Sequence, residues 1–214
     1  CNGAVDNATG TAALVALAQA NVKAGPSDRS QVFLAVTGEE SGLLGSAYYG
    51  NNPVFPFSKT VGGVNMDALS VAGLAKNVVV IGKGKSQLDA YLDRALGAQG
   101  RVATLEPTPE KGYYYRSDHF SFAKHGLPML YFEGGEDLVK GGTAAGMAAA
   151  EDYTEHRYHG PKDEYDPNWD WTGVAADLKL YYDVGRALAN TTDWPNWVDG
   201  DEFRAIRDKD RAGK

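Results

Sequence analysis

The sequence predicts an α/β fold: a three-layer α/β/α sandwich built on a mostly parallel mixed sheet. Apolar runs of strand length alternate along the chain with segments whose apolar residues recur at helical spacing. The first of these runs is continuously apolar, which is typical of strands buried on both faces. The 214 residues, of which 43% are hydrophobic, are enough for one domain with a sizeable core.

The elements follow one another in a regular order along the chain. Residues 8–24 are predicted to form a helix, with Asn7 or Thr9 as N-cap, and apolar residues around most of its circumference indicate a buried helix. The predicted strands cover residues 31–37, 60–67, 77–82 and 128–133. The other predicted helices cover residues 43–50, 86–100, 118–125 and 171–190.

Two segments are expected to be irregular. Residues 134–150, rich in glycine and alanine, are predicted to be a flexible surface loop of the kind that borders active sites. The tail, about 193–214, is expected to be partly flexible within a single domain over residues 1–214. The first residue, Cys1, is not a natural start, and it indicates a mature or trimmed piece of a longer protein.

Composition excludes several functions. The formal net charge of −7, from 28 acidic and 21 basic residues, argues against a nucleic-acid partner. No apolar run approaches the roughly 18–20 residues that cross a bilayer, so no membrane-spanning segment is expected. The single cysteine excludes an intrachain disulfide and a cysteine-rich zinc site. The H-E-x-x-H, G-x-S-x-G and phosphate-loop patterns are absent.

Acidic residues stand where predicted strands end. Glu39 and Glu40 follow the first strand, Asp67 ends the second, Asp6 precedes the first helix, and His159 follows the glycine-rich segment. Ligands of open α/β sheets gather outside the carboxyl ends of the strands, so these side chains are expected to converge. Their mutual repulsion requires a cation, and carboxylates combined with imidazole suit Zn²⁺ or a similar ion.

The two adjacent glutamates suit two different roles. Neighbouring residues that leave a strand end point in different directions. One of Glu39 and Glu40 is therefore expected to bind the metal, and the other to handle protons from a metal-bound water.

Five segments carry a resemblance to a known family: "GAVDNATGTAALVALA", "AVTGEESGLLGSAYY", "VNMDAL", "YRSDHFSFAKHGLPMLYF" and "YHGPKDEYD". In order, spacing and context the chain resembles the M28 family of zinc aminopeptidases over essentially residues 2–190. The resemblance implies a zinc-exopeptidase (phosphorylase/hydrolase-like) fold with its N-terminal strands missing. It also implies peptide substrates and an extracellular or periplasmic location.

The resemblance implies metal ligands residue by residue. Asp6 corresponds to the aspartate that bridges two zinc ions. Glu40 and His159 correspond to the further ligands of one zinc, and Asp67 corresponds to a ligand of the other. Two zinc ions are thus expected in the full-length enzyme.

The resemblance also implies catalytic and substrate-binding residues. Glu39 corresponds to the general base, and Tyr158 to the tyrosine that donates a hydrogen bond to the developing oxyanion. Arg116 is implied to lie near the substrate, with Asp118 in a supporting position, although a structural ion pair is an equal alternative for Arg116.

The sequence departs from the family pattern at one point. The family's first zinc ligand is a histidine of an HxD motif upstream of the bridging aspartate, and none of the five residues before Asp6 is a histidine. One zinc site, formed by Asp6, Glu40 and His159, keeps its three ligands. The second site is expected to be weak or empty, and the activity of this chain by itself is expected to be impaired.

Two other functions stay open, a glutaminyl-peptide cyclase with a single zinc and a non-catalytic, receptor-like module of the same fold.

Some side chains also have two interpretations. Asp163 and Asp166 either orient His159 or belong to a solvated turn. His119 either lines the cleft or packs in the interior, and His156 is expected to be a surface residue.

Overall fold

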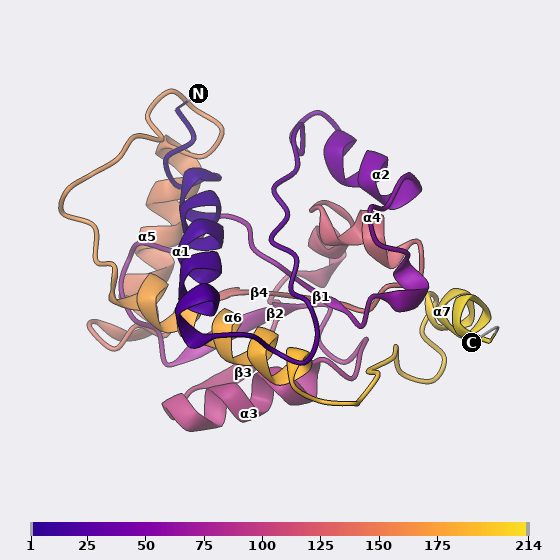
Figure 1. Cartoon of the computed structure of the whole chain (residues 1–214). Coiled ribbons are helices and arrows are strands. Elements are labelled where there is room, and N and C mark those ends of the chain that lie inside the picture. The colour runs from indigo at the N-terminus through magenta and orange to yellow at the C-terminus, as the bar shows by residue number, and fades with distance from the viewer. Residues whose placement is uncertain (1, 213–214) are drawn as a thin grey trace.

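A four-stranded mixed sheet lies at the centre of the computed structural model, which describes residues 2–212 (Figure 1). The strands are β1 (Gly63–Asn65), β2 (Asn77–Ile81), β3 (Val102–Leu105) and β4 (Met129–Gly134), in the order β1-β4-β2-β3. β1 is parallel to β4 and β2 is parallel to β3, whereas β2 and β4 are antiparallel. The mostly parallel mixed sheet is therefore confirmed.

Helices connect and cover these strands. The α-helices are α1 (Ala8–Ala24), α2 (Leu44–Asn51), α3 (Asp89–Gln99), α4 (His119–Ala123), α5 (Gly142–His156), α6 (Thr172–Ala189) and α7 (Arg204–Arg211). Short 3-10 turns cover Phe57–Lys59, Pro109–Lys111 and Tyr113–Tyr115. Among the described residues, no helix combines the length and the apolar character that crossing a bilayer would require.

Strand β2 shows why three layers form. Successive side chains of a strand point to opposite faces of the sheet. Val78 and Val80 belong to a core that includes residues of α3 and α6. Ile81 belongs to a second core with Ala123 of α4 and the buried Trp197. Helices therefore cover both faces, as the sequence predicted.

The segment after α6 returns to the sheet and takes part in the second core. Trp197 is fully buried, and its indole N–H donates to the carbonyl of Gly126 over 2.9 Å. Arg207 of α7 is also buried and donates to the carbonyls of Phe57 (2.8 Å) and Thr60 (2.7 Å). These contacts attach α7 beside the start of β1.

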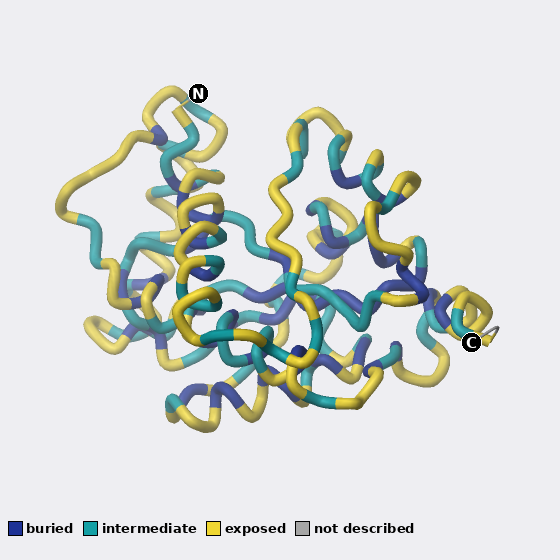
Figure 2. Tube along the Cα trace, viewed as in Figure 1, coloured by how far each residue is buried: buried dark blue, intermediate teal, exposed yellow. Residues whose placement is uncertain are grey.

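The predicted strand over residues 31–37 is wrong. The segment forms no regular element, and Val32, Phe33 and Leu34 are exposed (Figure 2). A strand exists only where a neighbour satisfies its backbone hydrogen bonds, and none of the four described strands pairs with this segment. The apolar run therefore has strand composition without the ladder that would make it a strand.

The predicted flexible loop over residues 134–150 is also wrong. Strand β4 continues to Gly134, and most of the remaining segment belongs to α5. Alanine has the highest helix propensity of all residues, and the alanines of "TAAGMAAA" outweigh its single internal glycine. Gly141 and Gly142, both at positive φ, lie at the start of the helix, where they do not interrupt it.

Helix α1 has the predicted bounds but is not buried around most of its circumference. The side chain of Asn7 accepts a hydrogen bond from the amide of Gly10 (2.9 Å), which confirms Asn7 as the N-cap. Ala13 and Leu17 are buried, whereas Val22 is 82% exposed. One face of α1 packs against the domain, and the opposite face is open to solvent (Figure 2).

His119 is a packed interior residue, which decides between the two interpretations of this side chain. It is fully buried, with its ring centroid 4.7 Å from that of Tyr114 and 4.9 Å from that of Tyr131. Burial disfavours the charged imidazolium, so the pKa of His119 falls to about 4 from an ordinary value of 6.5.

This lowered pKa predicts a loss of stability in acid. Between pH 6.5 and 4 the unfolded chain takes up a proton at His119 that the folded chain does not, so stability falls as the pH falls. We expect the free energy of unfolding to fall by about 3 kcal/mol more in the parent than in His119→Leu between pH 7 and pH 4. Urea titrations at both pH values measure this difference. His156→Leu, at an exposed histidine, serves as the control, and an equal loss in parent and His119→Leu would contradict the prediction.

Candidate metal centre

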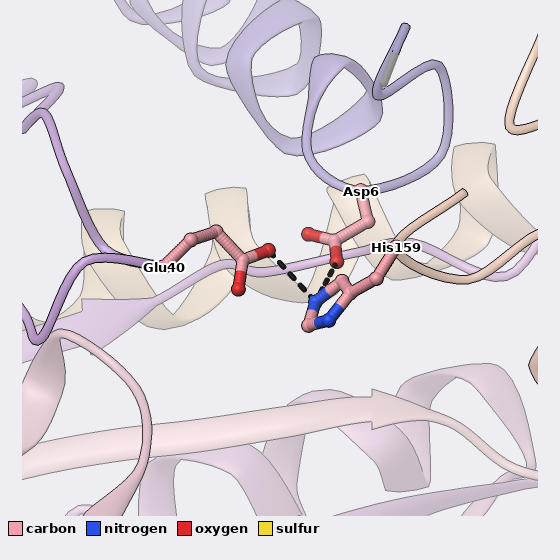
Figure 3. Close-up of side chains that lie close together, drawn as sticks. All are labelled: Asp6, Glu40 and His159. Carbon is pink, nitrogen blue, oxygen red and sulfur yellow. Dashed lines mark ion pairs between the residues drawn. The ribbon is translucent and has the colours of Figure 1, made fainter. Parts of the chain in front are cut away.

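Three side chains from distant parts of the sequence meet at one point (Figure 3). Asp6 comes from the turn before α1, Glu40 from the turn before α2, and His159 from the loop after α5. His159 Nε2 lies 2.8 Å from Glu40 Oε1 and 3.3 Å from Asp6 Oδ2. Within residues 2–212, no other group of three histidine, cysteine or acidic side chains comes together in this way.

The first turn of α1 brings Asp6 to the carboxyl end of β1. Thr9 is buried, and its hydroxyl donates to the carbonyl of Val5 (2.7 Å). The same hydroxyl accepts the amide of Leu69 (2.9 Å), which lies just after Asp67. One threonine therefore connects the segment that carries Asp6 to the segment that carries Asp67. The Asp6–Asn7 peptide bond is cis.

A turn bounded by two glycines carries the two adjacent glutamates. Gly38 (φ 70°) and Gly42 (φ 98°) adopt the left-handed conformation that glycine accepts without steric cost. The carbonyl of Glu39 accepts the amide of Leu43 (2.8 Å), which closes the turn. The side chain of Glu40 is 56% exposed, whereas Glu39 is partly buried. The two carboxylates thus occupy different environments.

A strained backbone carries His159. Its φ of 54° is left-handed, which costs a residue other than glycine roughly 1–2 kcal/mol. The ring of Tyr158 stacks on the imidazole, with centroids 3.7 Å apart and planes at 25°. The amide of Gly160 donates to the carbonyl of Arg157 (2.9 Å) and completes a tight turn around the histidine.

Asp67 lies beside the three-residue group without joining it. Its Oδ2 accepts a hydrogen bond from the Ser117 hydroxyl (2.7 Å), which in turn accepts from Asn65 Nδ2 (2.9 Å). Ser117 is buried and was not predicted as a site residue. Its place between Arg116 and Asp118 in "RSD" is the signal that could have identified it.

The carboxylates at this edge of the sheet share too little positive charge. Burial, followed by the charges of Asp67 and Glu40, raises the pKa of Asp6 to about 6. Burial and the same two neighbours raise the pKa of Glu39 to about 7. Each of these groups is therefore hard to ionise without a cation nearby, which is the electrostatic condition of an acidic metal site.

Glu133 is a further acidic residue that the sequence reasoning missed. Burial raises its pKa, a hydrogen bond from the Tyr131 hydroxyl lowers it, and the charge of Asp67 raises it, so that the resulting pKa is about 7. The register pairs Asn65 with Tyr131, so Asp67 and Glu133 are each two residues further along parallel strands. Glu133 ends a predicted strand, as Asp67 does, so the same rule could have identified it.

The other predicted site residues are Tyr158, Arg116 and Asp118. Tyr158 is exposed, and burial of its hydroxyl and nearby carboxylates raise its pKa to about 12, partly offset by the positive charge of Arg116. The guanidinium of Arg116 lies 5.5 Å from the ring centroid of Tyr113. Asp118 is partly buried, and burial raises its pKa. The substrate roles of Arg116 and Asp118 stay predictions.

Asp163 and Asp166 differ in their contacts. Asp166 is exposed and accepts hydrogen bonds from the backbone (2.8 Å) and side chain (2.9 Å) of Asn168, which is the solvated turn. Asp163 is buried, and its carboxylate accepts hydrogen bonds from the backbone of the Asp6 segment. His156, exposed on α5 beside Asp152, lies outside the metal group, as predicted.

The donor set fits a zinc ion. Zinc prefers four nitrogen, oxygen or sulfur ligands in a tetrahedron, with bonds of about 2.0–2.2 Å to nitrogen and oxygen, which places ligand atoms ~3.4 Å apart. The distance of 3.3 Å from His159 Nε2 to Asp6 Oδ2 is close to that value, whereas the 2.8 Å to Glu40 Oε1 is a hydrogen-bond distance that would lengthen around an ion. Three protein ligands would leave the fourth position for water or substrate, as in catalytic zinc sites.

Solved structures of other proteins share the fold of this chain. The chain is similar in structure to an aminopeptidase from Aneurinibacillus sp. strain AM-1, with TM-score 0.64 and 21% identity over 90% of this chain and 41% of the other. The LapA aminopeptidase of Legionella pneumophila gives TM-score 0.64 and 17% identity over 89% of this chain and 48% of the other. The chain thus spans less than half the length of these solved structures.

Sequence comparison identifies the family. No curated protein sequence matches the chain. The family model described as "Peptidase family M28" matches residues 1–182, which is most of the chain. The chain therefore belongs to peptidase family M28.

Proposed function

We propose that this chain forms the zinc-binding catalytic part of an aminopeptidase, which removes the N-terminal residue of peptides. The observation that carries the proposal is the meeting of Asp6, Glu40 and His159 from three separate segments. Membership of a peptidase family gives the reaction class, and the two similar structures are both described as aminopeptidases.

Asp6, Glu40 and His159 would hold one zinc ion in this chain. When bound, the ion would polarise the scissile carbonyl and lower the pKa of a coordinated water towards neutrality. Asp6 and Asp67 would supply two ligands of a second, weaker site, because no third ligand lies with them among the described residues. Ser117 would hold the carboxylate of Asp67 in place.

Glu39 and Tyr158 would carry the proton and hydrogen-bond chemistry. Glu39 is partly buried beside Glu40, and its raised pKa of about 7 suits a group that accepts a proton and returns it to the leaving amine. Tyr158 keeps its proton at neutral pH, because its pKa is raised to about 12. Its hydroxyl can therefore donate a hydrogen bond to the developing oxyanion.

The second candidate is a glutaminyl-peptide cyclase. The observation that favours it is that a single group of three ligands forms within residues 2–212. A cyclase with one zinc would need only this group. The two functions differ in the product formed from a peptide with an N-terminal glutamine.

Substitution of Glu39 tests the proposed function. We expect Glu39→Gln to keep the zinc affinity of the parent, because this residue is not one of the three clustered ligands. We expect turnover of leucine p-nitroanilide by the zinc-loaded chain to fall about 10²- to 10⁴-fold, the usual contribution of a general base. Zinc titration and the absorbance assay, run on the same preparations, measure both quantities.

Glu151→Gln, the same chemical change at an exposed position of α5, is the matched control and should behave as the parent. Cyclisation of an N-terminal glutamine peptide without cleavage of the p-nitroanilide would establish the cyclase instead. A chain that binds zinc and converts neither substrate would show that the aminopeptidase proposal is wrong for this chain.

A further inference from the structure

Asp163 is a buried acidic residue in the loop between α5 and α6, only 1% exposed. Its Oδ1 accepts the amide of Val5 (2.9 Å) and its Oδ2 accepts the amide of Asp6 (3.0 Å). Its own main-chain carbonyl accepts the amide of Ala4 (3.1 Å). One residue therefore binds three consecutive amides of the segment that ends in a predicted metal ligand.

No lysine, arginine or histidine forms an ion pair with Asp163 in the part of the chain that the structure describes. A buried carboxylate is stable only when hydrogen bonds replace its lost hydration. The two amides supply most of that replacement, and the Tyr153 hydroxyl adds a longer contact of 3.4 Å to Oδ2. The carboxylate and residues 4–6 consequently hold each other in place.

The position of Asp163 along the chain connects this contact to His159. Asp163 lies four residues after His159, and its amide donates to the carbonyl of Gly160 (3.2 Å), so it is part of the same tight loop. The loop that presents His159 therefore also fixes the backbone that presents Asp6. Asp6 and His159 lie on segments more than 150 residues apart in sequence, yet their side chains are 3.3 Å apart. The contact of Asp163 with the Asp6 segment holds these two segments together.

We propose that Asp163 is a positioning residue for the metal centre, which sets the distance between Asp6 and His159. This inference rests on the proposed zinc site. Asp163 differs from a residue that orients a metal ligand by bonding to the histidine ring. Its carboxylate accepts hydrogen bonds from the backbone of Val5 and Asp6, and Asp6 is the other ligand. It acts before any ion binds, by reducing the freedom of the two ligands relative to each other.

Asp163→Asn tests the proposal. Asparagine keeps the shape of the side chain but turns one of the two acceptor oxygens into a donor, which would face the amide of Val5 or Asp6. We expect zinc affinity to fall about 10- to 100-fold, as for other residues that orient metal ligands. Affinity is measured by competition with a chromophoric chelator, at a temperature where circular dichroism shows each variant folded.

Two further variants make the test specific. Asp166→Asn is the same change three residues later at an exposed position, and its zinc affinity should equal that of the parent. Tyr153→Phe removes only the 3.4 Å contact and should lower zinc affinity about two- to threefold, in line with about 0.5 kcal/mol for a weak hydrogen bond. This variant decides the matter if Asp163→Asn does not fold, because unchanged affinity would then contradict the proposal.

The outcomes separate this inference from the proposed function. If the parent binds zinc and Asp163→Asn binds it equally well with a lower melting temperature, Asp163 is merely structural and the inference is wrong. If the parent itself binds no zinc, the zinc-peptidase proposal fails, and the positioning role is overturned with it. A loss of affinity in Asp163→Asn but not in Asp166→Asn, with the fold kept, supports both.

Discussion

Replacing His159 with alanine is expected to lower zinc affinity by more than about 100-fold, beyond the 10- to 100-fold that the loss of an outer-shell partner usually costs. His159 Nε2 is the one nitrogen among the three clustered ligand atoms and lies within 3.3 Å of both carboxylates. Removal would leave Asp6 and Glu40 without the group between them. Isothermal titration with zinc, followed by metal analysis of the dialysed protein, measures the loss.

His156→Ala is the matched control for this experiment. His156 lies three residues earlier at the end of α5, is exposed, and contacts Asp152 instead of the metal group. Its removal should leave the zinc affinity unchanged. Equal zinc binding by His159→Ala and the parent would show that the ion, if bound, lies elsewhere, and the assignment of Asp6 and Glu40 would fall as well.

The sequence predicted those elements whose residues bury a regular face. Strand β2 and helices α3 and α6 lie within a few residues of their predicted bounds because their apolar spacing matches what they bury. The edge strand β3 was missed. Val102 and Leu105 at its ends are exposed, so it lacks the buried apolar run that indicates a strand. An edge strand depends on the register of its single neighbour, which local composition does not contain.

Residues 31–37 fail for the opposite reason. Their apolar run favours a strand locally, but a strand requires a neighbour and is not a property of one segment. Helix α5 is not predicted, because the glycines of residues 134–150 favour a loop, whereas the alanines that surround them favour a helix. In both segments local composition indicates the wrong structure, because the first depends on a long-range partner and the second on a helix propensity summed over many residues.

The three metal-site residues could be predicted because each stands at a turn that the sequence marks. Glu40 follows the glycine-bounded end of an apolar run, and Asp6 stands just before a capped helix. The residues that support them are different in kind. Ser117 and Asp163 act through hydrogen bonds to residues more than 45 positions away, and such pairs depend on how the loops dock.

The largest expected effect on stability lies away from the site, at the buried ion pair of Arg101 and Asp177. Arg101 Nη1 donates to Asp177 Oδ1 over 2.7 Å, and both side chains are at most 5% exposed. The guanidinium also donates to Gln99 Oε1 (3.2 Å) and to the carbonyl of Asn77 (3.2 Å). The pair therefore connects α6 to strand β2 and to the start of β3.

Asp177→Leu is expected to lower the free energy of unfolding by about 3–5 kcal/mol, because it leaves the Arg101 charge buried without a partner. Chemical denaturation at neutral pH measures this. Asp183→Leu, which breaks the more exposed pair with Lys179 on the same helix, should cost less than about 1 kcal/mol.

The double variant Arg101→Met/Asp177→Leu tests whether the two buried charges interact. It removes both charges and fills the space with apolar groups, so it should be more stable than Asp177→Leu alone, although the carbonyl of Asn77 loses one donor. A double variant that loses the sum of the two single losses would show that the charges do not interact. In that case the cost of each single change would come from packing, and α6 would be held to the sheet by its apolar face, which includes Leu180 and Val184.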